Sequence, residues 1–250
     1  MISLQDKNIL ITGASSGLGR ECAVILSKIG AKVILVGRNE TRLNQTMTLL
    51  EGYGHLSYQM DVTDFDNIEN LVSDCVNKIG KLDGFVHCAG VELTMPLQIM
   101  NYSKYNELFS TNAIAAFEFS KILSKKKYYN SLGASFVFIS SVTGLLGVSG
   151  KIGYCSSKAA LVTGAKAMAL ELANKKIRVN SILPGMVDTE MFQKIKTELS
   201  EESLLDIDRR HPLGIGKPED VANLCAFLLS DLSKWITGSD YIIDGGYSCQ

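Results

Sequence analysis

The chain has 250 residues, of which 46% are hydrophobic and 20% are charged, and its formal net charge is −1. This length and composition fit one sizeable α/β domain. Because the charge is close to neutral, nothing attracts the chain as a whole to nucleic acid or to an anionic membrane. Its apolar runs are far shorter than the roughly 18 residues of a membrane span. We therefore expect neither a nucleic-acid partner nor a membrane partner.

Cysteine and histidine usage gives no indication of disulfides or metal ligands. The six cysteines and three histidines are scattered, without a CxxC pair or a histidine at metal-ligand spacing. The cysteines are typical of buried small hydrophobic residues in a reducing compartment. Residues 1–7 lead straight into a strand pattern, so no signal peptide is indicated. We expect a cytoplasmic protein without a metal site.

The first apolar run, residues 8–12, leads into a glycine-rich segment, residues 13–19, and a helical pattern follows as far as Gly30. In this strand–loop–helix context glycines allow a sharp exit from the strand and a close approach of the backbone to a phosphate. The N-terminus of the helix would supply free N–H groups for a pyrophosphate. A plain turn is the alternative, and the spacing GxxxGxG differs from the commoner GxGxxG. The flanking pattern favours phosphate binding.

The second strand, residues 32–36, ends in Gly37-Arg38-Asn39, and a helix follows as far as Leu50. In a dinucleotide-binding fold an acidic residue at this strand end would hold the ribose 2′-hydroxyl of NAD. Gly37 leaves that position empty, and the Arg38 guanidinium suits a 2′-phosphate. The sequence therefore favours NADP(H) over NAD(H), unless Arg38 is simply a solvated surface charge.

The third unit has a strand at 56–60, then Asp61 and Val62, and a helix at about 64–79. Asp61 falls at the carboxyl end of the strand, where ligands bind in such sheets. It either contacts the ligand, caps the following loop, or does both. The further expected elements are strands at 82–88, 134–139, 177–183 and 241–243, and helices at about 102–129, at about 153–173 and from Pro218 onward.

Strands and helices alternate from end to end. We predict one Rossmann-type domain over residues 1–250, an α/β fold with a doubly wound, seven-stranded parallel sheet and helices on both faces. Residues 186–212 lack strand character and mix apolar residues with many charges. A segment of this length between regular elements predicts a lid or substrate loop.

Tyr154 and Lys158 lie four residues apart in a segment of good helix formers, so they would share one face of a helix. A free tyrosine has a pKa of about 10. A nearby positive charge favours the phenolate and would make the phenol a usable general acid or base. Taken alone, the spacing is also what chance produces on many helices.

The chain resembles the short-chain dehydrogenase/reductase family over essentially its whole length. The residues that carry the resemblance are Thr12-Gly13-Ala14-Ser15-Ser16-Gly17-Leu18-Gly19, Asp61, Ala89-Gly90, Asn112, Ser141, Tyr154, Lys158 and Pro184-Gly185.

The resemblance implies a role for each matched catalytic position. Tyr154 would be the general acid of carbonyl reduction, and Lys158 would hold the nicotinamide ribose and lower the pKa of the tyrosine. Ser141 would hydrogen-bond the carbonyl oxygen, where negative charge develops; Ser140 is the other candidate, but the family spacing favours Ser141. Asn112 would organise a water that exchanges protons with Lys158.

The resemblance also implies the cofactor contacts. Asp61 and Val62 would contact the adenine, Pro184-Gly185 would pack near the nicotinamide, and Thr189 would touch its carboxamide. The expected cofactor-binding residues are Gly13, Ser15, Ser16, Gly17, Leu18, Gly19, Arg38, Asp61, Val62, Ala89, Gly90, Tyr154, Lys158, Pro184, Gly185, Val187 and Thr189.

One segment departs from the family pattern: His87-Cys88-Ala89-Gly90 stands where Asn-Asn-Ala-Gly is usual. The two asparagines usually stabilise the central sheet, so this departure affects packing rather than catalysis. We interpret His87 as a hydrogen-bonded structural residue.

Within the family the chain looks most like the 3-oxoacyl-[acyl-carrier-protein] reductases, through the segments 210–222 and 244–246. This implies an NADPH-dependent reductase of a ketone or aldehyde that also runs in reverse, with a place in fatty acid biosynthesis. A sugar, polyol or steroid alcohol dehydrogenase is the alternative, and a dinucleotide-binding sensor without catalysis is a further one.

Two expectations concern partners. The lysines 125–127 and 175–176 would meet an acidic carrier protein, although a helix dipole explains the first cluster equally well. The family commonly forms tetramers, so the resemblance implies a homotetramer, or a homodimer, through the helices that carry Asn112 and Tyr154.

Overall fold

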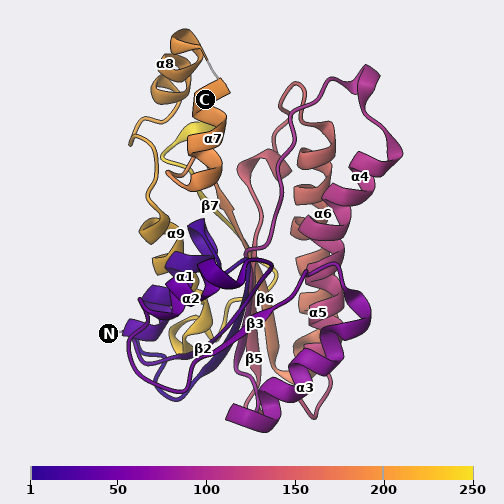
Figure 1. Ribbon diagram of the computed structural model, residues 1–250, viewed down its shortest axis with the longest axis vertical. Coiled ribbons are helices and arrows are strands. Elements are labelled where there is room, and N and C mark those ends of the chain that lie inside the picture. The colour runs from indigo at the N-terminus through magenta and orange to yellow at the C-terminus, as the bar shows by residue number, and fades with distance from the viewer. Residues whose placement is uncertain (1, 199, 250) are drawn as a thin grey trace.

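The computed structural model describes residues 2–198 and 200–249. Within these residues seven strands form one parallel sheet in the order β3-β2-β1-β4-β5-β6-β7 (Figure 1). The predicted doubly wound parallel sheet is thereby confirmed. The strands are β1 (Asn8–Thr12), β2 (Lys32–Gly37), β3 (Leu56–Gln59), β4 (Gly84–His87), β5 (Ala134–Ile139), β6 (Ile177–Pro184) and β7 (Asp240–Ile243).

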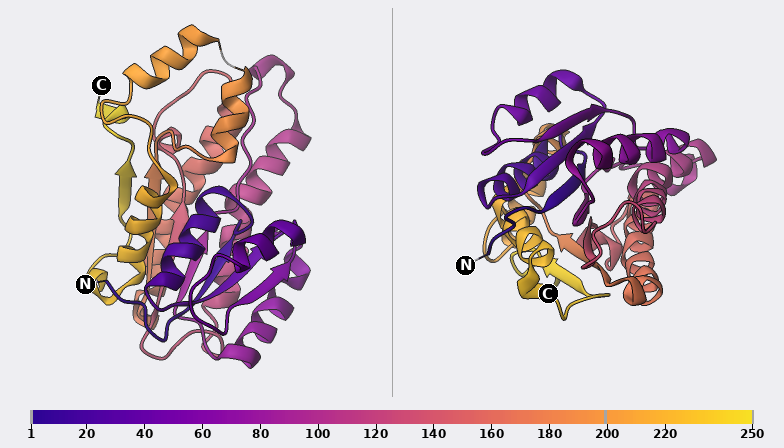
Figure 2. Two further views of the ribbon diagram at one scale, coloured as in Figure 1. Left: turned by 60° about the vertical axis from the view of Figure 1, so that its left-hand side comes forward. Right: turned by 90° about the horizontal axis from the view of Figure 1, so that it is seen from below.

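Helices cover both faces of this sheet. α1, α2 and α9 pack on one face, and α3, α5 and α6 pack on the other (Figures 1 and 2). The helices are α1 (Gly17–Lys28), α2 (Glu40–Met47), α3 (Ile68–Ile79), α4 (Tyr102–Phe109), α5 (Ala115–Leu123), α6 (Ile152–Leu172), α7 (Glu190–Glu198), α8 (Glu201–Arg209) and α9 (Pro218–Leu229).

The two larger hydrophobic cores result from the alternation of side chains along each strand. In β1, Leu10 packs into the core formed with α3, α5 and α6, whereas Ile9 and Ile11 pack into the core formed with α1 and α9. A strand that is buried on both faces has to be apolar throughout. This is why β1 and β5 read as largely apolar runs in the sequence.

Strand order reverses between β1 and β4, since β1 is followed in the sequence by β2 on one side and neighbours β4 on the other. In open parallel sheets a crevice forms beyond the carboxyl ends of the strands at such a switch point. A binding crevice is therefore expected beyond the carboxyl ends of β1 and β4.

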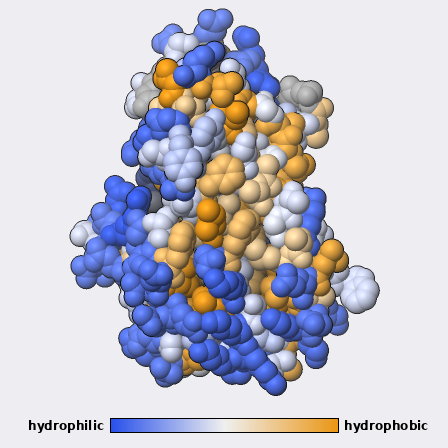
Figure 3. Space-filling view, turned by 90° about the vertical axis from the view of Figure 1, so that its right-hand side faces the viewer, coloured by the Kyte–Doolittle hydropathy of each residue, from blue (hydrophilic) through white to orange (hydrophobic). Residues whose placement is uncertain are grey.

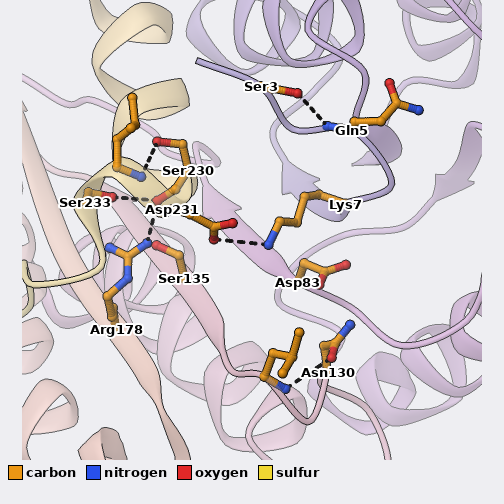
Figure 4. A network of polar contacts seen from close by, with 12 residues as sticks. Ser3, Gln5, Lys7, Asp83, Asn130, Ser135, Arg178, Ser230, Asp231 and Ser233 are labelled. Carbon is orange, nitrogen blue, oxygen red and sulfur yellow. Dashed lines mark hydrogen bonds and ion pairs between the residues drawn. The ribbon is translucent and has the colours of Figure 1, made fainter. Parts of the chain in front are cut away.

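The opposite, amino edge of the sheet is closed by polar contacts (Figure 4). The Arg178 guanidinium, at the start of β6, donates to the carbonyl oxygens of Leu228 at 2.7 Å and Ser230 at 3.3 Å. Lys7 pairs with Asp231 at 3.2 Å. The Lys7–Asp231 pair joins the first and last thirds of the chain.

The expected helix at 102–129 is wrong in its extent. The helix expected at 102–129 ends at Leu123 and is interrupted by a π-helical turn at Ser110–Ile114, and residues 125–127 lie beyond its end. The chain turns there because the carbonyl of Tyr128 accepts the N–H of Leu82, which brings it back to the start of β4. The basic cluster therefore lies at the amino edge of the sheet.

The segment 186–212 is not an irregular loop, since it contains α7 and α8, which extend beyond the carboxyl edge (Figure 1). Acidic residues occupy the first turn of each helix and a basic residue occupies each last turn. That arrangement complements the helix dipole, and it is the sequence signal that marks the two helices. Among the described residues, none of the helices has the length and apolar character needed to cross a membrane.

Candidate active site

The glycine-rich loop between β1 and α1 packs against the end of β4. Gly13 has a φ of 69°, and a Cβ atom on it would lie 2.7 Å from the backbone nitrogen of Ala89. A Cβ atom on Gly19 would collide with the carbonyl oxygen of Gly13. Glycine is required at both positions for the loop to lie this close to the sheet.

Helix α1 begins inside this loop. It starts at Gly17, and the side chain of Ser16, the residue before it, makes no capping hydrogen bond. The first N–H groups of a helix lack intrahelical partners and form the positive end of its dipole. Loop and helix start together form an arrangement suited to a phosphate group.

A cleft of about 530 Å³ opens at the carboxyl ends of β1, β2 and β4. This volume lies in the usual range for cofactor sites, about 300–1,000 Å³. The sequence-predicted residues that line the cleft are Gly13, Ser15, Ser16, Gly17, Leu18, Gly19, Arg38, Asp61, Val62, Ala89, Gly90 and Thr189.

One end of the cleft carries two arginines and a carboxylate. Arg38 pairs with Asp61 at 3.7 Å. Burial raises the pKa of Asp61, but hydrogen bonds from Thr63 and the nearby Arg38 guanidinium outweigh this and hold it below its ordinary value. Thus Asp61 both caps the following turn and faces the cleft. Arg42, in the first turn of α2, also lines the cleft. Sequence reasoning missed this residue, although it lies only four positions after Arg38 and at the start of the following helix.

The start of α7 closes over the glycine loop. Thr189 and Glu190 line the cleft, and Glu190 pairs with Arg20 of α1 at 3.5 Å. Arg20 is itself held by the carbonyl oxygen of Ser15 at 2.7 Å. Sequence reasoning missed Glu190, because nothing in its neighbourhood marks a contact with residues so far away in the chain.

Five predicted cofactor residues do not line this cleft: Tyr154 and Lys158 on α6, and Pro184, Gly185 and Val187. Pro184 is the last residue of β6, Gly185 follows it and donates its N–H to Ile243, and Val187 is buried. A Cβ atom on Gly185 would lie 2.8 Å from the Cβ atom of Asp244. Pro184, Gly185 and Val187 form the backbone that leads from the sheet to α7.

The structure brings Tyr154 and Lys158 together on α6. The Lys158 ammonium lies 5.8 Å from the centroid of the Tyr154 ring. It is 5% exposed and donates to the carbonyl oxygen of Ile139 at 2.8 Å. Burial lowers the pKa of Lys158 to about 8. The site thus contains a buried amine that titrates close to neutral pH.

The pKa of Tyr154 is raised above its ordinary value, which differs from the predicted lowering. Burial of the phenol is the largest cause, the Glu92 carboxylate adds to it, and a hydrogen bond with Ser141 acts in the opposite direction. Burial disfavours the phenolate more strongly than the neighbouring groups favour it. In this environment Tyr154 is therefore a neutral phenol, which is the form that can donate a proton.

The two candidate serines have different environments. Ser140 is buried and donates its hydroxyl hydrogen to the carbonyl oxygen of Lys158 at 2.8 Å, so it is used in packing. Ser141 precedes a short 3-10 turn and lies close enough to the phenol of Tyr154 to act on its pKa, which it lowers. Its oxygen also accepts from the Thr143 hydroxyl at 3.0 Å. Of the two, only Ser141 reaches the phenol.

Asn112 lies in the π-helical turn between α4 and α5, and is buried. Its side-chain oxygen accepts the N–H of Val91 at 2.8 Å, and its amide donates to the Ser157 hydroxyl at 2.9 Å. A Cβ atom on Gly90 would lie 3.4 Å from both the Asn112 oxygen and the Lys158 nitrogen. Asn112 and Lys158 therefore meet across Gly90, and π-helical turns of this kind are frequent at functional sites.

His87 is fully buried and hydrogen-bonded, as expected for a structural residue. Its Nδ1 lies 2.9 Å from the Thr12 hydroxyl and its Nε2 lies 3.2 Å from the Thr111 carbonyl oxygen. Burial, followed by the nearby Lys158 charge, lowers the pKa of His87 to about 3. In the neutral ring, Nε2–H donates to Thr111, so Nδ1 accepts from Thr12. His87 thus joins β1 to β4 and supports the turn that holds Asn112.

No three His, Cys, Asp or Glu side chains within residues 2–198 and 200–249 are arranged to hold a metal ion. The titratable groups of the site are instead a phenol, an amine and a carboxylate. Such a set can move a proton at one position next to a dinucleotide-sized cleft.

Comparisons with known proteins match this geometry over nearly the whole chain. The model of a family described as "Enoyl-(Acyl carrier protein) reductase" matches residues 13–248. The 3-oxoacyl-[acyl-carrier-protein] reductase FabG of Rickettsia felis is 35% identical over 247 residues, which cover 98% of both chains. FabG of Thermotoga maritima is 35% identical over 246 residues, which cover 97% of this chain and 98% of its own.

Solved structures give the same result. A short-chain type dehydrogenase/reductase from Mycobacterium ulcerans superposes with a TM-score of 0.91 at 31% identity, covering 99% of this chain and 92% of its own. One from Mycobacterium marinum superposes with a TM-score of 0.90 at 31% identity, covering 100% and 98%. These relatives are oxidoreductases by name.

Proposed function

We propose that this chain, which belongs to the short-chain dehydrogenase/reductase family of oxidoreductases, reduces a ketone or aldehyde carbonyl to an alcohol with NADPH, and also catalyses the reverse reaction. The observation that carries the proposal is the grouping of Tyr154, Ser141 and Lys158: the Lys158 ammonium lies 5.8 Å from the centroid of the Tyr154 ring, and the surroundings favour the neutral phenol. A phenol in this state is a proton donor, which carbonyl reduction requires.

The catalytic roles follow from the contacts. Tyr154 donates its proton to the carbonyl oxygen as that oxygen gains negative charge, and Ser141 hydrogen-bonds the same oxygen. Lys158, with its pKa near 8, exchanges protons with solvent on the side of Asn112 and holds the nicotinamide ribose. NADPH bound in the cleft supplies the hydride.

The residues of the cleft fit a dinucleotide. Glycines stand where a Cβ atom would fill the space beside the sheet, and the start of α1 has N–H groups for a diphosphate. Asp61 and Val62 hold the adenine, Ala89 and Gly90 line the middle of the cleft, and Thr189 contacts the nicotinamide end. Pro184, Gly185 and Val187 support that end from behind.

Preference for NADPH rests on Arg38 and Arg42. Both line the same end of the cleft, next to Gly37, where no carboxylate follows β2 directly. Two guanidinium groups can hold a 2′-phosphate. We expect Arg38→Ala and Arg42→Ala each to weaken NADPH binding by about 10- to 100-fold, the loss of one charge-assisted hydrogen bond or two, and to leave NADH binding unchanged. Binding titrations with both cofactors measure this, and an equal loss for both would reject the assignment.

The substrate that we propose is a 3-oxoacyl thioester carried by an acyl carrier protein. The named relatives support it, since FabG of Rickettsia felis and that of Thermotoga maritima are 3-oxoacyl-[acyl-carrier-protein] reductases. The lysines 125–127 do not support carrier docking, because Glu69 pairs with Lys125 at 2.6 Å and with Lys127 at 3.1 Å at the far edge of the sheet. A carrier would have to approach the carboxyl edge instead.

We further propose that the chain self-associates in the cytoplasm as a homotetramer or homodimer. The face formed by α4, α5 and α6 carries a broad apolar patch (Figure 3). Exposed apolar side chains on these helices include Tyr102, Ile114, Ile152 and Leu170. Patches of this kind mark interaction sites. Light scattering gives the subunit count, and a monomer at micromolar concentration would contradict the proposal.

A screen of NADPH oxidation tests the function. The panel contains a 3-oxoacyl thioester, the matching 2-enoyl thioester, keto sugars, a ketosteroid and small ketones. We expect turnover of the 3-oxoacyl thioester and none of the enoyl thioester, because a proton donor at oxygen serves a carbonyl rather than a carbon–carbon double bond. Turnover of a sugar or steroid alone would replace the acyl substrate, and turnover of the enoyl thioester alone would overturn the carbonyl assignment.

A further inference from the structure

An ion pair whose two residues do not line the cleft lies beside the ring of Tyr154. Glu92 follows β4 and Lys151 immediately precedes α6, and their charged atoms are 2.7 Å apart. Their side chains are 13% and 19% exposed, which is far less than in the surface ion pairs of this protein. The Thr94 hydroxyl donates to the Glu92 carboxylate at 2.9 Å.

The two loops that carry this pair are fastened to each other. The N–H of Met95 donates to the carbonyl oxygen of Gly150 at 2.7 Å, and Gly150 has a φ of 75°. A Cβ atom on Gly150 would press on the Thr94 methyl at 3.3 Å. Backbone contacts therefore fix the loops independently of the ion pair, so the pair is free to serve another purpose.

The pair lies close to the phenol. The Lys151 ammonium lies 5.9 Å from the centroid of the Tyr154 ring, almost as near as Lys158 at 5.8 Å. After burial, the Glu92 carboxylate is the largest cause that raises the pKa of Tyr154. The charged and titratable groups around the phenol are thus Lys158, Lys151, Glu92 and, with a smaller contribution, the Cys155 thiol.

We propose that Glu92 and Lys151 are positioning residues that keep Tyr154 in its neutral form, with Glu92 opposing the phenolate and Lys151 limiting that effect. The inference rests on the proposed function, because a neutral phenol matters only if Tyr154 is the proton donor. It deepens that function: the site is ready for carbonyl reduction at neutral pH, and alcohol oxidation, which needs the phenolate, requires alkaline pH.

Substitutions of Glu92 and Lys151 should have opposite effects on the Tyr154 titration, whereas a purely structural ion pair would give effects in the same direction or none. Glu92→Gln removes the negative charge, so Tyr154 should titrate lower by on the order of one pH unit. Below the pKa this raises the phenolate fraction, and with it the rate of alcohol oxidation, by about tenfold at a fixed pH. Lys151→Met leaves Glu92 uncompensated, and should lower that rate at the same pH.

The kinetic experiment measures alcohol oxidation with NADP⁺ from about pH 6 to about pH 10, the range in which the acid limb reports the phenol. The alcohol is the product of whichever carbonyl the wild type reduces. Glu69→Gln is the matched control, since it also removes a carboxylate that pairs with lysine, but at the far edge of the sheet. The control should follow the wild-type profile.

A second readout does not depend on turnover. Protein labelled with ¹³C at the tyrosine ring carbon that bears oxygen is titrated by NMR, and the Tyr154 signal is the one missing from Tyr154→Phe. Opposite displacements of this titration in Glu92→Gln and Lys151→Met support the inference. If both variants titrate like the wild type, or both move in the same direction, the inference is wrong.

The double variant Glu92→Gln with Lys151→Gln guards against loss of folding, because it keeps a hydrogen-bonded pair without charge. Its titration should fall between those of the single variants. If the Tyr154 titration moves in opposite directions in the two single variants but the protein reduces none of the carbonyls, the role of the ion pair is supported and the proposed function is refuted. If the protein reduces a carbonyl but the Tyr154 titration is the same in both variants as in the wild type, the proposed function is supported and the role of the ion pair is refuted.

Discussion

Buried cationic side chains have different surroundings at the two edges of the central sheet. At the amino edge, Arg178 donates to three backbone carbonyl groups, including that of Ile236 at 3.3 Å. At the carboxyl edge, the more deeply buried Lys158 donates to the carbonyl oxygen of Ile139. The first charge is matched by its surroundings, whereas the second is held in a site that favours its neutral form.

Tyrosines show the same contrast. Tyr128, at the amino edge, is buried and donates its hydroxyl hydrogen to Glu69 at 3.0 Å, in a cluster that also contains Lys125. Tyr154, at the carboxyl edge, is kept neutral by burial and by Glu92. One edge uses its polar groups for stability, and the other keeps groups whose protonation can change.

The contrast implies that substitutions at the two edges separate activity from stability. Removing a polar group at the amino edge should destabilise the fold and leave turnover per folded molecule intact. Removing one at the carboxyl edge should abolish turnover at little or no cost in stability.

Tyr154→Phe should lower kcat for carbonyl reduction by about 10²- to 10⁴-fold, the usual contribution of a general acid. NADPH affinity and the melting temperature should stay the same, because the ring is kept. Tyr128→Phe is the matched change at the other edge: kcat should be unchanged, and the free energy of unfolding should fall by about 1 kcal/mol with the lost hydrogen bond. Equal kcat in Tyr154→Phe and wild type would remove Tyr154 from catalysis.

Lys158→Met should stabilise the fold at pH 7 while abolishing activity. Burial lowers the pKa of Lys158 from its ordinary 10.5 to about 8, which corresponds to a cost of about 3 kcal/mol. Loss of the hydrogen bond to Ile139 destabilises the fold by about 1 kcal/mol. We therefore expect a net gain of about 2 kcal/mol in the free energy of unfolding.

The sign of the pH dependence follows from linkage. Below pH 8 the amine is charged in both states and the full penalty applies. As pH rises from 8 to 10.5 the folded state loses the proton before the unfolded state does, so the wild type gains stability and the advantage of Lys158→Met disappears. Denaturant unfolding at several pH values measures this, with the exposed Lys234→Met as control; a pH-independent difference would contradict burial of the charge.

Arg178→Met should lower the free energy of unfolding by about 2 kcal/mol, since hydrogen bonds to a charged donor are worth about 1.5–3 kcal/mol. Turnover per folded molecule should not change. Lys176→Met removes a nearby cation whose ammonium has no partner among the described residues, and should be neutral. A loss of turnover in Arg178→Met at full folding would break the separation between the edges.

Much of the fold could be predicted because its strands are buried on both faces. The bounds of β1 and β5 agree with prediction residue for residue, since apolar runs end where the chain leaves the sheet. The helix ends were less predictable: α5 ends at Leu123 because Tyr128 has to pair with Leu82, a contact far away in the sequence.

The candidate site could be predicted as a list of residues, but its electrostatics could not. Sequence spacing brings Tyr154 and Lys158 together, and it suggests that the ammonium lowers the pKa of the phenol. The opposite direction results from burial and from Glu92, which lies more than sixty positions from Tyr154 along the chain. Packing of the loops brings Glu92 close to Tyr154, and no periodic pattern in the sequence indicates this proximity.

Hydrogen–deuterium exchange with and without NADPH tests most directly that the carboxyl edge is the functional edge. The account predicts slower exchange on NADPH addition in residues 13–19, 38–42, 61–62, 89–91 and 189–191. It predicts no change at the amino edge, in residues 81–84, 128–134 and 231–237. Protection confined to the amino edge, or none at millimolar NADPH, would contradict it.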